Sequence, residues 1–248
     1  MITFSSVWKT YAKEITAKAH TALGGVSFSL ANGETLGLIG ANGAGKSTCI
    51  KLVMDFIRPD QGSITVFDDQ PRNHLLRRRI GYLPETASFP ANLTVLDMLR
   101  YTGATCQMPP KAIRDKGAKL LTRLNLWEAR KRPLRDYSKG MQQRANFAIA
   151  LLHDPELLIL DEPMSGLDPI GRADILALIL ELKQQGRSIL FCSHILEDVD
   201  RVAGRVLLLH QGKSLFEGAP AALCEQTGRA TLADGFLKLV QGENVHAA

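Results

Sequence analysis

The sequence predicts an α/β fold with an inserted helical subdomain, and three observations lead to this prediction. A strand pattern at residues 35–39 runs directly into a glycine-rich loop that opens a helix. From about residue 89 to 152 no strand pattern appears, and apolar residues recur at helical spacing. After this insert, strands and helices alternate again. That order is typical of a sheet covered by helices, interrupted by a helical segment.

Upstream of the insert, residues 4–8 and 26–30 alternate polar and apolar side chains, as half-buried strands do. Asn32 and Gly33 predict a tight turn between the second of these strands and the strand at 35–39. A helix is predicted over 46–56, ended by the Arg58-Pro59-Asp60 segment. Short strands are predicted at 63–67 and 80–83.

Within and beyond the insert, the clearest predicted helices are 93–99 and 118–126. Strands return at 157–160, 188–192 and 206–209, and the most periodic of the helices between them is 173–182. Residues 211–213 predict a hairpin turn. We expect one main domain over 1–217, with the helical subdomain at about 89–152, and a short tail over 218–248 with one helix at 231–240.

The composition is that of an ordinary globular chain. Its 248 residues are 45% hydrophobic and 22% charged. No secretory signal is expected, because no basic segment followed by an apolar run opens the chain. The most apolar helical stretch, 175–182, is far shorter than the roughly 20 residues that span a bilayer. If the protein serves a membrane process, another chain must supply the membrane part.

The clusters of positive charge have two possible roles, and the cysteines indicate the redox compartment. The net charge of +5 gathers in residues 72–79 and 130–135, which form either a solvated face or a surface for anionic lipid or an acidic partner. The four cysteines show no C-x-x-C pair and no histidine at zinc spacing, so we expect thiols in a reducing compartment.

The glycine-rich loop fits the phosphate-loop pattern G-x-x-x-x-G-K-S without a mismatch, and it has the strand-before, helix-after context that the pattern requires. Its glycines let the backbone approach phosphates, and the helix N-terminus adds partial positive charge. We expect Lys46 to reach the β- and γ-phosphates of ATP, Ser47 to ligate Mg²⁺ and Thr48 to add a phosphate contact. The predicted phosphate-binding residues are Gly40, Ala41, Asn42, Gly43, Ala44, Gly45, Lys46, Ser47 and Thr48.

A pair of carboxylates follows the apolar strand at 157–160. The strand is expected to hold Asp161 beside the Mg²⁺ ion, and Glu162 is then placed to polarise an attacking water as general base. Exposed carboxylates at a strand end are the plain alternative. The catalytic interpretation is favoured by the segment directly after the pair, which reads Pro163-Met164-Ser165-Gly166-Leu167-Asp168.

A third motif, Tyr137-Ser138-Lys139-Gly140-Met141-Gln142-Gln143-Arg144, lies between these two. The order of the three motifs resembles the ATP-binding cassette (ABC) ATPases, over nearly the whole chain to about residue 217. The resemblance implies a RecA-like P-loop core with an antiparallel β portion and a helical subdomain. It also implies a homodimer that sandwiches ATP, each ATP being bound by the phosphate loop of one chain and by Ser138, Lys139 and Gly140 of the other.

The resemblance implies roles for further residues. Residues 165–168 resemble the D-loop at the dimer interface, so Asp168 is expected to face the partner's ATP. His194, after the strand at 188–192, resembles the switch histidine that contacts the γ-phosphate, although a lone histidine at a strand end is often structural. Tyr11 stands where the family carries an aromatic that stacks on adenine; Trp8 is the alternative, and it fits the strand alternation better.

Two departures from the family pattern narrow the resemblance. The usual Leu-Ser-Gly-Gly-Gln has Tyr137, Lys139 and Met141 at three of its positions, and the Q-loop glutamine is replaced by Glu85, which can still contact Mg²⁺ or its water. Both variants resemble bacterial ABC-2-type exporters. The expected protein is a cytoplasmic ATPase subunit, peripheral on the inner face of the membrane, with a separate permease and no nucleic-acid partner. An ATPase of a soluble assembly, such as iron–sulfur assembly, is the alternative.

Overall fold

The structure is a computed structural model, and it describes residues 1–11, 19–86 and 88–246. The chain forms two compact units, one made of residues 1–74 and 188–248 and the other of residues 75–187. The tail beyond residue 217 belongs to the first unit, so the compact units do not divide where the sequence placed the end of the main domain.

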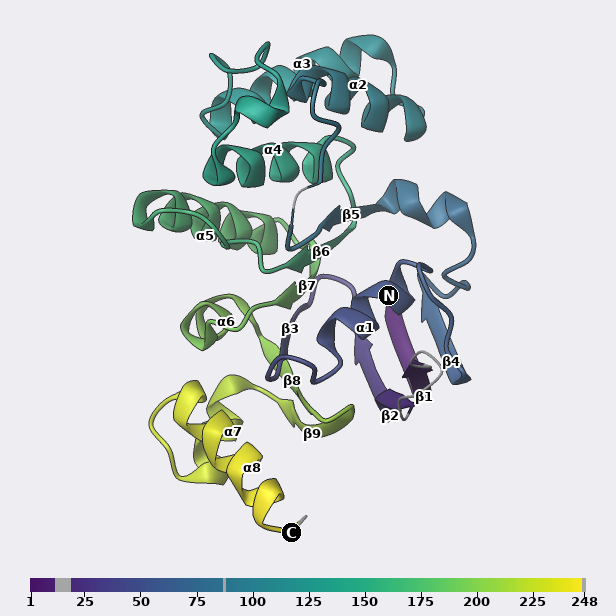
Figure 1. The fold of residues 1–248 in the computed structure, drawn as a ribbon, viewed down its shortest axis with the longest axis vertical. Coiled ribbons are helices and arrows are strands. Elements are labelled where there is room, and N and C mark those ends of the chain that lie inside the picture. Colours follow the sequence, from purple (N-terminus) through teal and green to yellow (C-terminus); the bar gives the residue numbers. More distant parts are fainter. Residues whose placement is uncertain (12–18, 87, 247–248) are drawn as a thin grey trace. The chain divides into compact units, whose positions relative to one another are not determined.

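The first unit contains two groups of paired strands (Figure 1). Strands β1 (Ile2–Tyr11), β2 (His20–Leu30) and β4 (Gln61–Val66) form an antiparallel sheet in the order β2-β1-β4. In the second group β3 (Thr35–Ile39) pairs in parallel with both β7 (Ser188–Cys192) and β8 (Arg205–His210). Strand β9 (Lys213–Gly218) pairs antiparallel with β8. Every residue of β3 and of β7 is buried, as parallel strands require.

The helices of the first unit, among its described residues, are α1 (Lys46–Val53), α6 (Leu196–Val202), α7 (Pro220–Thr227) and α8 (Leu232–His246). Strand β3 packs closely against α6 at Gly37, where an added Cβ would lie 2.6 Å from a methyl of Val199. The two residues of the β8–β9 turn, Gln211 and Gly212, have φ of 46° and 76°. Positive φ at both positions is the type I′ geometry of a two-residue hairpin, and it confirms the predicted turn.

The second unit contains the parallel pair β5 (Ile80–Leu83) and β6 (Leu157–Asp161). Its helices are α2 (Val95–Thr105), α3 (Pro110–Arg123), α4 (Lys139–Leu151) and α5 (Pro169–Gln184) (Figure 1). Short 3-10 helices cover His74–Arg79, at the passage between the units, and Leu134–Asp136. Helix α4 buries most of one side, with Phe147 at its centre. It packs closely against β5 at Gly81, where an added Cβ would lie 2.5 Å from the Ala150 carbonyl oxygen.

The sequence misplaced several helix ends for one shared reason. Helices α1, α2 and α3 are each followed by a residue with positive φ that is not glycine: Asp55 (53°), Gln107 (57°) and Asn125 (55°). After each of them a backbone N–H reaches back five residues, as from Phe56 to Lys51 at 2.9 Å. This is the turn that usually uses glycine. The predicted helix 46–56 therefore ends at Val53, and the predicted helix 118–126 ends at Arg123. This second helix also begins earlier than predicted, at Pro110.

The prediction of one helix in the tail was wrong, because the structure has two, α7 and α8. Helix α7 begins with Pro220 at its first position, where the missing N–H costs nothing, and it ends at Gly228 with φ of 63°. In the sequence this proline and glycine indicate a loop, and only seven residues separate them. The helix is held by packing: Leu223 and Thr227 are buried in the first unit.

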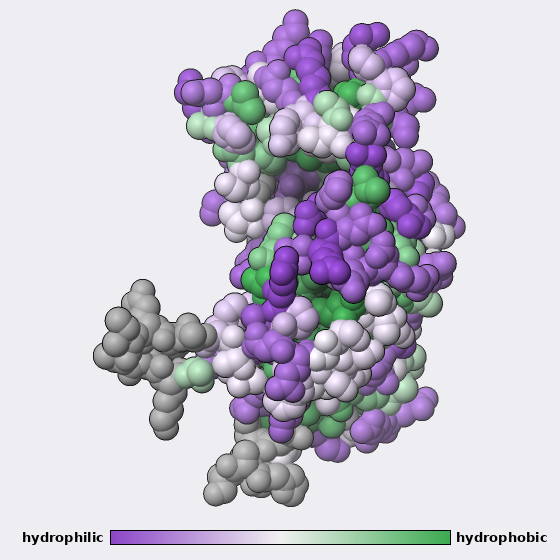
Figure 2. Space-filling model, turned by 90° about the vertical axis from the view of Figure 1, so that its right-hand side faces the viewer, coloured by the Kyte–Doolittle hydropathy of each residue, from purple (hydrophilic) through white to green (hydrophobic). Residues whose placement is uncertain are grey.

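The face drawn in Figure 2 is mostly polar. Hydrophilic residues cover much of the face in Figure 2, with smaller apolar areas among them. Within the described ranges, none of the helices combines the length and the hydropathy that crossing a membrane requires. The cysteines are free thiols, with Cys49 and Cys192 buried, and burial raises the pKa of Cys49 to about 12.

Candidate functional site

The phosphate loop connects β3 to α1 in a conformation that only glycine adopts easily at two positions. Gly40 has φ of 157° and an added Cβ would lie 2.4 Å from the Leu209 carbonyl oxygen. Gly45 caps α1 with φ of 114°, and a Cβ there would lie 2.7 Å from the Leu23 side chain. The loop is therefore held between β8 and β2, and its outer residues Ala41, Asn42 and Gly43 are exposed.

Lys46 and its neighbours open α1 under this loop. The Lys46 ammonium donates to the carbonyls of Gly40 at 2.7 Å and Ala41 at 3.2 Å, so the side chain folds back along the loop. Ser47 is exposed and Thr48 is buried. The Tyr11 hydroxyl lies 3.5 Å from the Thr48 hydroxyl, so the last residue of β1 reaches the first turn of α1. Trp8 instead lies over Gly24 and Gly25 of β2.

These residues fit a bound nucleotide. The first N–H groups of α1 have no carbonyl partner inside the helix, and the loop is open beside Gly43, where an added Cβ would meet nothing within 4 Å. A pocket of about 500 Å³ borders residues 41–44, with His20 and His210 among its other walls. Within the part of the chain that the structure describes, no three His, Cys, Asp or Glu side chains cluster as a metal site.

The carboxylate pair lies in the second unit, where β6 ends. Asp161 is its last residue and is buried, and Glu162 follows with φ of 48°. The side-chain amide of Gln143, from α4, donates to the Pro163 carbonyl at 2.9 Å and lies 3.4 Å from the Glu162 carbonyl. Gln143 is buried, so this hydrogen bond is shielded from water and fixes the backbone that carries Glu162.

The third motif begins α4. Ser138 is the N-cap, its hydroxyl accepting from the Met141 N–H at 3.2 Å, and both Ser138 and Lys139 are exposed. Tyr137, directly before them, is buried and donates its hydroxyl proton to the Ala129 carbonyl at 2.8 Å. The tyrosine that replaces leucine is thus an anchor for the segment, and it leaves the next two residues at the surface.

Residues 166–168 lie beside the start of α4. An added Cβ on Gly166 would lie 3.4 Å from the Lys139 Cβ, and one on Gly140 would lie 3.5 Å from the Leu167 side chain. Asp168 is the N-cap of α5, its carboxylate accepting from the Gly171 N–H at 2.9 Å. The second unit therefore brings Ser138, Lys139 and Gly140 together with the segment that ends at Asp168.

Glu85 and His194 lie at the ends of two strands, in different units. Glu85 is exposed two residues after β5, and the carbonyl of Pro84 before it accepts from the Asn146 amide of α4 at 3.3 Å. Residue 87, in the segment after Glu85, lies outside the described residues. His194 is exposed two residues after β7, and the preceding Ser193 hydroxyl accepts from the Ile195 N–H at 3.1 Å.

The predicted site residues are divided between the two units. Tyr11, the phosphate loop and His194 belong to the first unit, and the others to the second. Gln143 belongs to the third motif but was given no role from the sequence, and Asn146 was not singled out; the two residues connect α4 to the segments after β6 and β5. The signal was present, because both are polar residues on the helix side that also carries Phe147 and other apolar residues.

A family model described as ABC transporter matches residues 23–165, which is more than half of the chain. The chain belongs to the ABC transporter family. The predicted resemblance is thereby confirmed. An ABC transporter ATP-binding protein from Synechocystis is 41% identical over 79% of this chain and 56% of its own length. The Nod factor export ATP-binding protein I of Sinorhizobium fredii is 34% identical over 91% of this chain and 64% of its own. The chain therefore spans less than two thirds of either relative.

Two solved structures confirm the ABC fold. The ATP-binding subunit of an ABC transporter superposes with a TM-score of 0.86 at 29% identity, covering 96% of this chain and 98% of that one. A dimeric ATP-binding cassette with ADP and Pi superposes with a TM-score of 0.81 at 22% identity, covering 88% and 98%. The predicted α/β class, with an antiparallel β portion and a helical subdomain, is therefore correct for this ABC protein.

Proposed function

We propose that this ABC protein binds and hydrolyses ATP as the ATPase subunit of an exporter. The observation that carries the proposal is the hydrogen bond from Gln143 to the carbonyl of Pro163, 2.9 Å long. Through this bond the helix that begins at Ser138 holds the backbone beside Glu162. A change at Ser138, where a second chain's ATP would bind, is in this way connected to the residue that would act on water.

In the proposed reaction, Glu162 accepts a proton from the attacking water as the water oxygen bonds to the γ-phosphorus. The bond from that phosphorus to the β–γ bridging oxygen breaks, and ADP leaves. Lys46 binds the β- and γ-phosphates, His194 contacts the γ-phosphate and Tyr11 stacks on adenine. Ser47, Asp161 and Glu85 would hold Mg²⁺. When bound, the ion would neutralise negative charge on the two terminal phosphates.

The site is proposed to be completed by a second copy of the chain. Ser138 and Lys139 are exposed at the N-terminus of α4, where the helix dipole and the Lys139 ammonium both favour an anion. With Gly140 and Asp168 they would face the ATP on the partner's phosphate loop. The dimeric cassette with ADP and Pi, which has the same fold, is consistent with such an arrangement.

Transport is proposed to occur in a separate permease, to which the ATPase would bind on the inner face of the membrane. The similarity to a Nod factor export protein supports export as the direction. The motif variants at Lys139 and Glu85 agree with it. Coexpression with a neighbouring gene that encodes about six hydrophobic spans should yield a complex that survives purification in detergent. A chain that never associates with such a permease would contradict this part of the proposal.

Size-exclusion chromatography of Glu162→Gln with ATP tests the two-chain site. If hydrolysis reopens the dimer, the variant should accumulate as an ATP-bound dimer, because its trans contacts form and are not released. Glu128→Gln is the matched control, since Glu128 is exposed on the second unit and makes the same charge change. A Glu162→Gln protein that stays monomeric with ATP, both alone and with the permease, would count against a shared site.

A further inference from the structure

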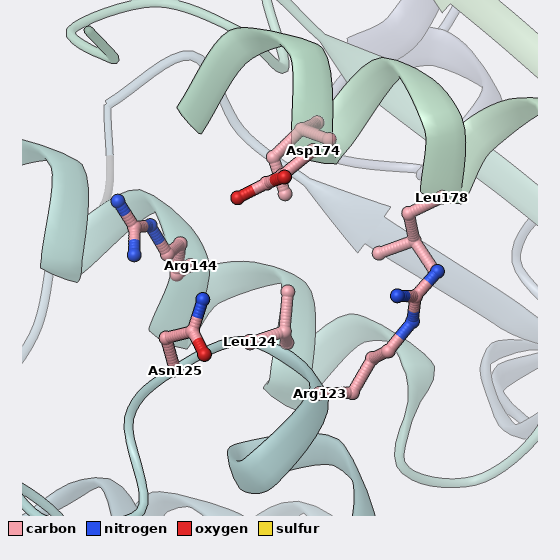
Figure 3. Close-up of a pocket in the computed structure, with 7 residues that line it drawn as sticks. Arg123, Leu124, Asn125, Arg144, Asp174 and Leu178 are labelled. Carbon is pink, nitrogen blue, oxygen red and sulfur yellow. The ribbon is translucent and has the colours of Figure 1, made fainter. Parts of the chain in front are cut away.

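A pocket in the second unit, with none of the proposed ATP-site residues in its lining, contains two charged side chains that form no ion pair with the described residues. It is lined by Arg144 of α4, by Asp174, Ile175 and Leu178 of α5, and by Arg123, Leu124 and Asn125 at the end of α3 (Figure 3). Its volume is about 190 Å³. Sites for drug-sized ligands begin at roughly 300 Å³, so an occupant must be small.

Among the residues that line the pocket, Arg144 has a buried hydrogen-bond donor that no described residue satisfies. Its Nε is buried and has no hydrogen-bond partner among the described residues. The tip of its guanidinium lies near the first turn of α5, where an added Cβ on Gly171 would be 3.2 Å from Nη2. This Nε has almost no exposed surface, so an anion in the pocket would bind the outer nitrogens of the guanidinium and stabilise its charge there. Arg123, by contrast, is already paired with Glu181 at 2.9 Å.

The other polar groups of the pocket define the acceptor more closely. In Figure 3 the Asn125 amide lies beside Arg144, and the Asp174 carboxylate of α5 faces them across the pocket. Asp174 forms no ion pair with the described residues that line the pocket. A simple anion would be attracted by Arg144 and repelled by Asp174. Leu124, Ile175 and Leu178 are buried and give the pocket an apolar floor.

We propose that this pocket binds a small zwitterion, a molecule with a carboxylate and an ammonium group on a short aliphatic frame, such as a free amino acid. Its carboxylate would accept from Arg144 and Asn125, its ammonium would donate to Asp174, and its carbon frame would lie on the apolar floor. Both unpaired charges are then satisfied by one ligand. The proposal does not depend on ATP hydrolysis, because all seven residues lie outside the proposed ATP site.

Calorimetric titration of the full chain tests this binding site. The zwitterionic probes are L-alanine, L-leucine, β-alanine and 4-aminobutanoate, which differ in the spacing of their charges. Butanoate and butylamine carry one charge each and serve as controls. At least one zwitterion should bind with a Kd of about 1 mM or below, at least about tenfold more tightly than either control. The proposal is overturned if no zwitterion binds at about 10 mM, or if butanoate binds as tightly as the best zwitterion.

Variants separate the two ends of the ligand. Asp174→Asn should weaken the best zwitterion by about tenfold or more, because the ammonium contact is lost. Butanoate should bind more tightly to this variant than to the wild type, because the repulsion by Asp174 is removed. Asn125→Asp should weaken both, since it places a negative charge beside the carboxylate. Asn125 has positive φ, which aspartate also tolerates, so this variant should keep the fold. A substitution of Arg144 is avoided because it would disturb α4. Asp115→Asn, on the exposed side of α3, is the control. Equal affinities in Asp174→Asn and Asp115→Asn would refute the site.

Discussion

The side-chain amide of Gln143, on α4, donates a hydrogen bond to the main-chain carbonyl of Pro163, 2.9 Å away. Gln143 is 4% exposed, so water has little access to the bond. Pro163 is also buried, and it follows Asp161 and Glu162 directly. The helix that starts at Ser138 is therefore fixed to the loop that carries the two carboxylates by one shielded contact.

Gln143→Met should break this contact while keeping the side-chain volume. The Pro163 carbonyl is then buried without a partner, and the free energy of unfolding should fall by about 1–3 kcal/mol. The ATPase rate should fall as well, because the Glu162 backbone loses a constraint. Urea unfolding and phosphate release measure the two effects. Gln185→Met, at the exposed end of α5, is the control, and equal stability of the two variants would mean that the Gln143 contact contributes nothing.

The sequence predicted the strands best where all or nearly all of their residues are buried. The predicted bounds of 35–39, 80–83 and 188–192 are those of β3, β5 and β7. These are short apolar runs with clear ends. The N-terminal strands extend beyond their apolar alternation, since β1 continues through Tyr11 by pairing with β2 across several bulges. Pairing between distant segments, which sets such ends, leaves no local pattern in the sequence.

For the site, the sequence predicted which motifs occur but not the contacts that support them. The phosphate loop and the Asp161–Glu162 pair have patterns that follow from their chemistry. The bonds of Gln143 to Pro163 and of Asn146 to Pro84 join residues 20 and 62 positions apart. They depend on how α4 packs in the second unit, and that packing is a tertiary result. The same holds for the pocket at Arg144, because its residues come from three helices.

Lys46→Ala should raise the Kd for ATP by about 100-fold or more, because the phosphates lose a charge-assisted hydrogen bond in a partly buried position. Lys46 is half-buried, and its side chain donates hydrogen bonds only to two loop carbonyls among the described residues. The free energy of unfolding of the variant without ATP should therefore change little. Calorimetric titration with ATP and Mg²⁺ gives the affinity. Lys51→Ala removes an exposed lysine from the same helix and serves as the control. If Lys46→Ala binds ATP like Lys51→Ala, Lys46 does not bind the phosphates.

His153 predicts a pH dependence of stability. Burial lowers the pKa of His153 from its usual 6.5, while its Nε2 lies 2.9 Å from the Ile80 carbonyl oxygen and its buried Nδ1 has no partner among the described residues. The unfolded chain then binds a proton more readily than the folded one. Stability from this group is present above pH 6.5 and is lost as the pH falls from there through the lower folded pKa.

His153→Gln should remove that part of the pH dependence, since glutamine keeps an N–H donor and does not titrate. Urea unfolding at about pH 7.5 and about pH 5.5 should show a smaller loss of stability for the variant than for the wild type. His74→Gln, at an exposed histidine, should behave like the wild type. An identical pH dependence for His153→Gln and the wild type would show that His153 does not titrate differently on folding.

Glu85 tests the Q-loop position. Glu85→Gln removes a negative charge but keeps an oxygen, so phosphate repulsion eases while Mg²⁺ loses attraction. The ATPase rate should stay within about tenfold of the wild type, a barrier change of roughly 1.4 kcal/mol or less. Glu85→Ala should do more damage, mainly to the stimulation of the ATPase by the permease. Rates with and without the permease decide the matter: a Glu85→Ala protein that equals the wild type in both would make Glu85 an ordinary surface residue.

If Glu162 activates water for ATP hydrolysis, its replacement by glutamine should slow the release of phosphate. The amide keeps the size of the side chain but cannot take the proton. The rate should fall by about 10²–10⁴-fold, the usual contribution of a positioned base. ATP affinity, measured on the same protein, should remain within about tenfold of the wild type. A Glu162→Gln protein that releases phosphate at the wild-type rate would contradict the assignment of Glu162 as the base.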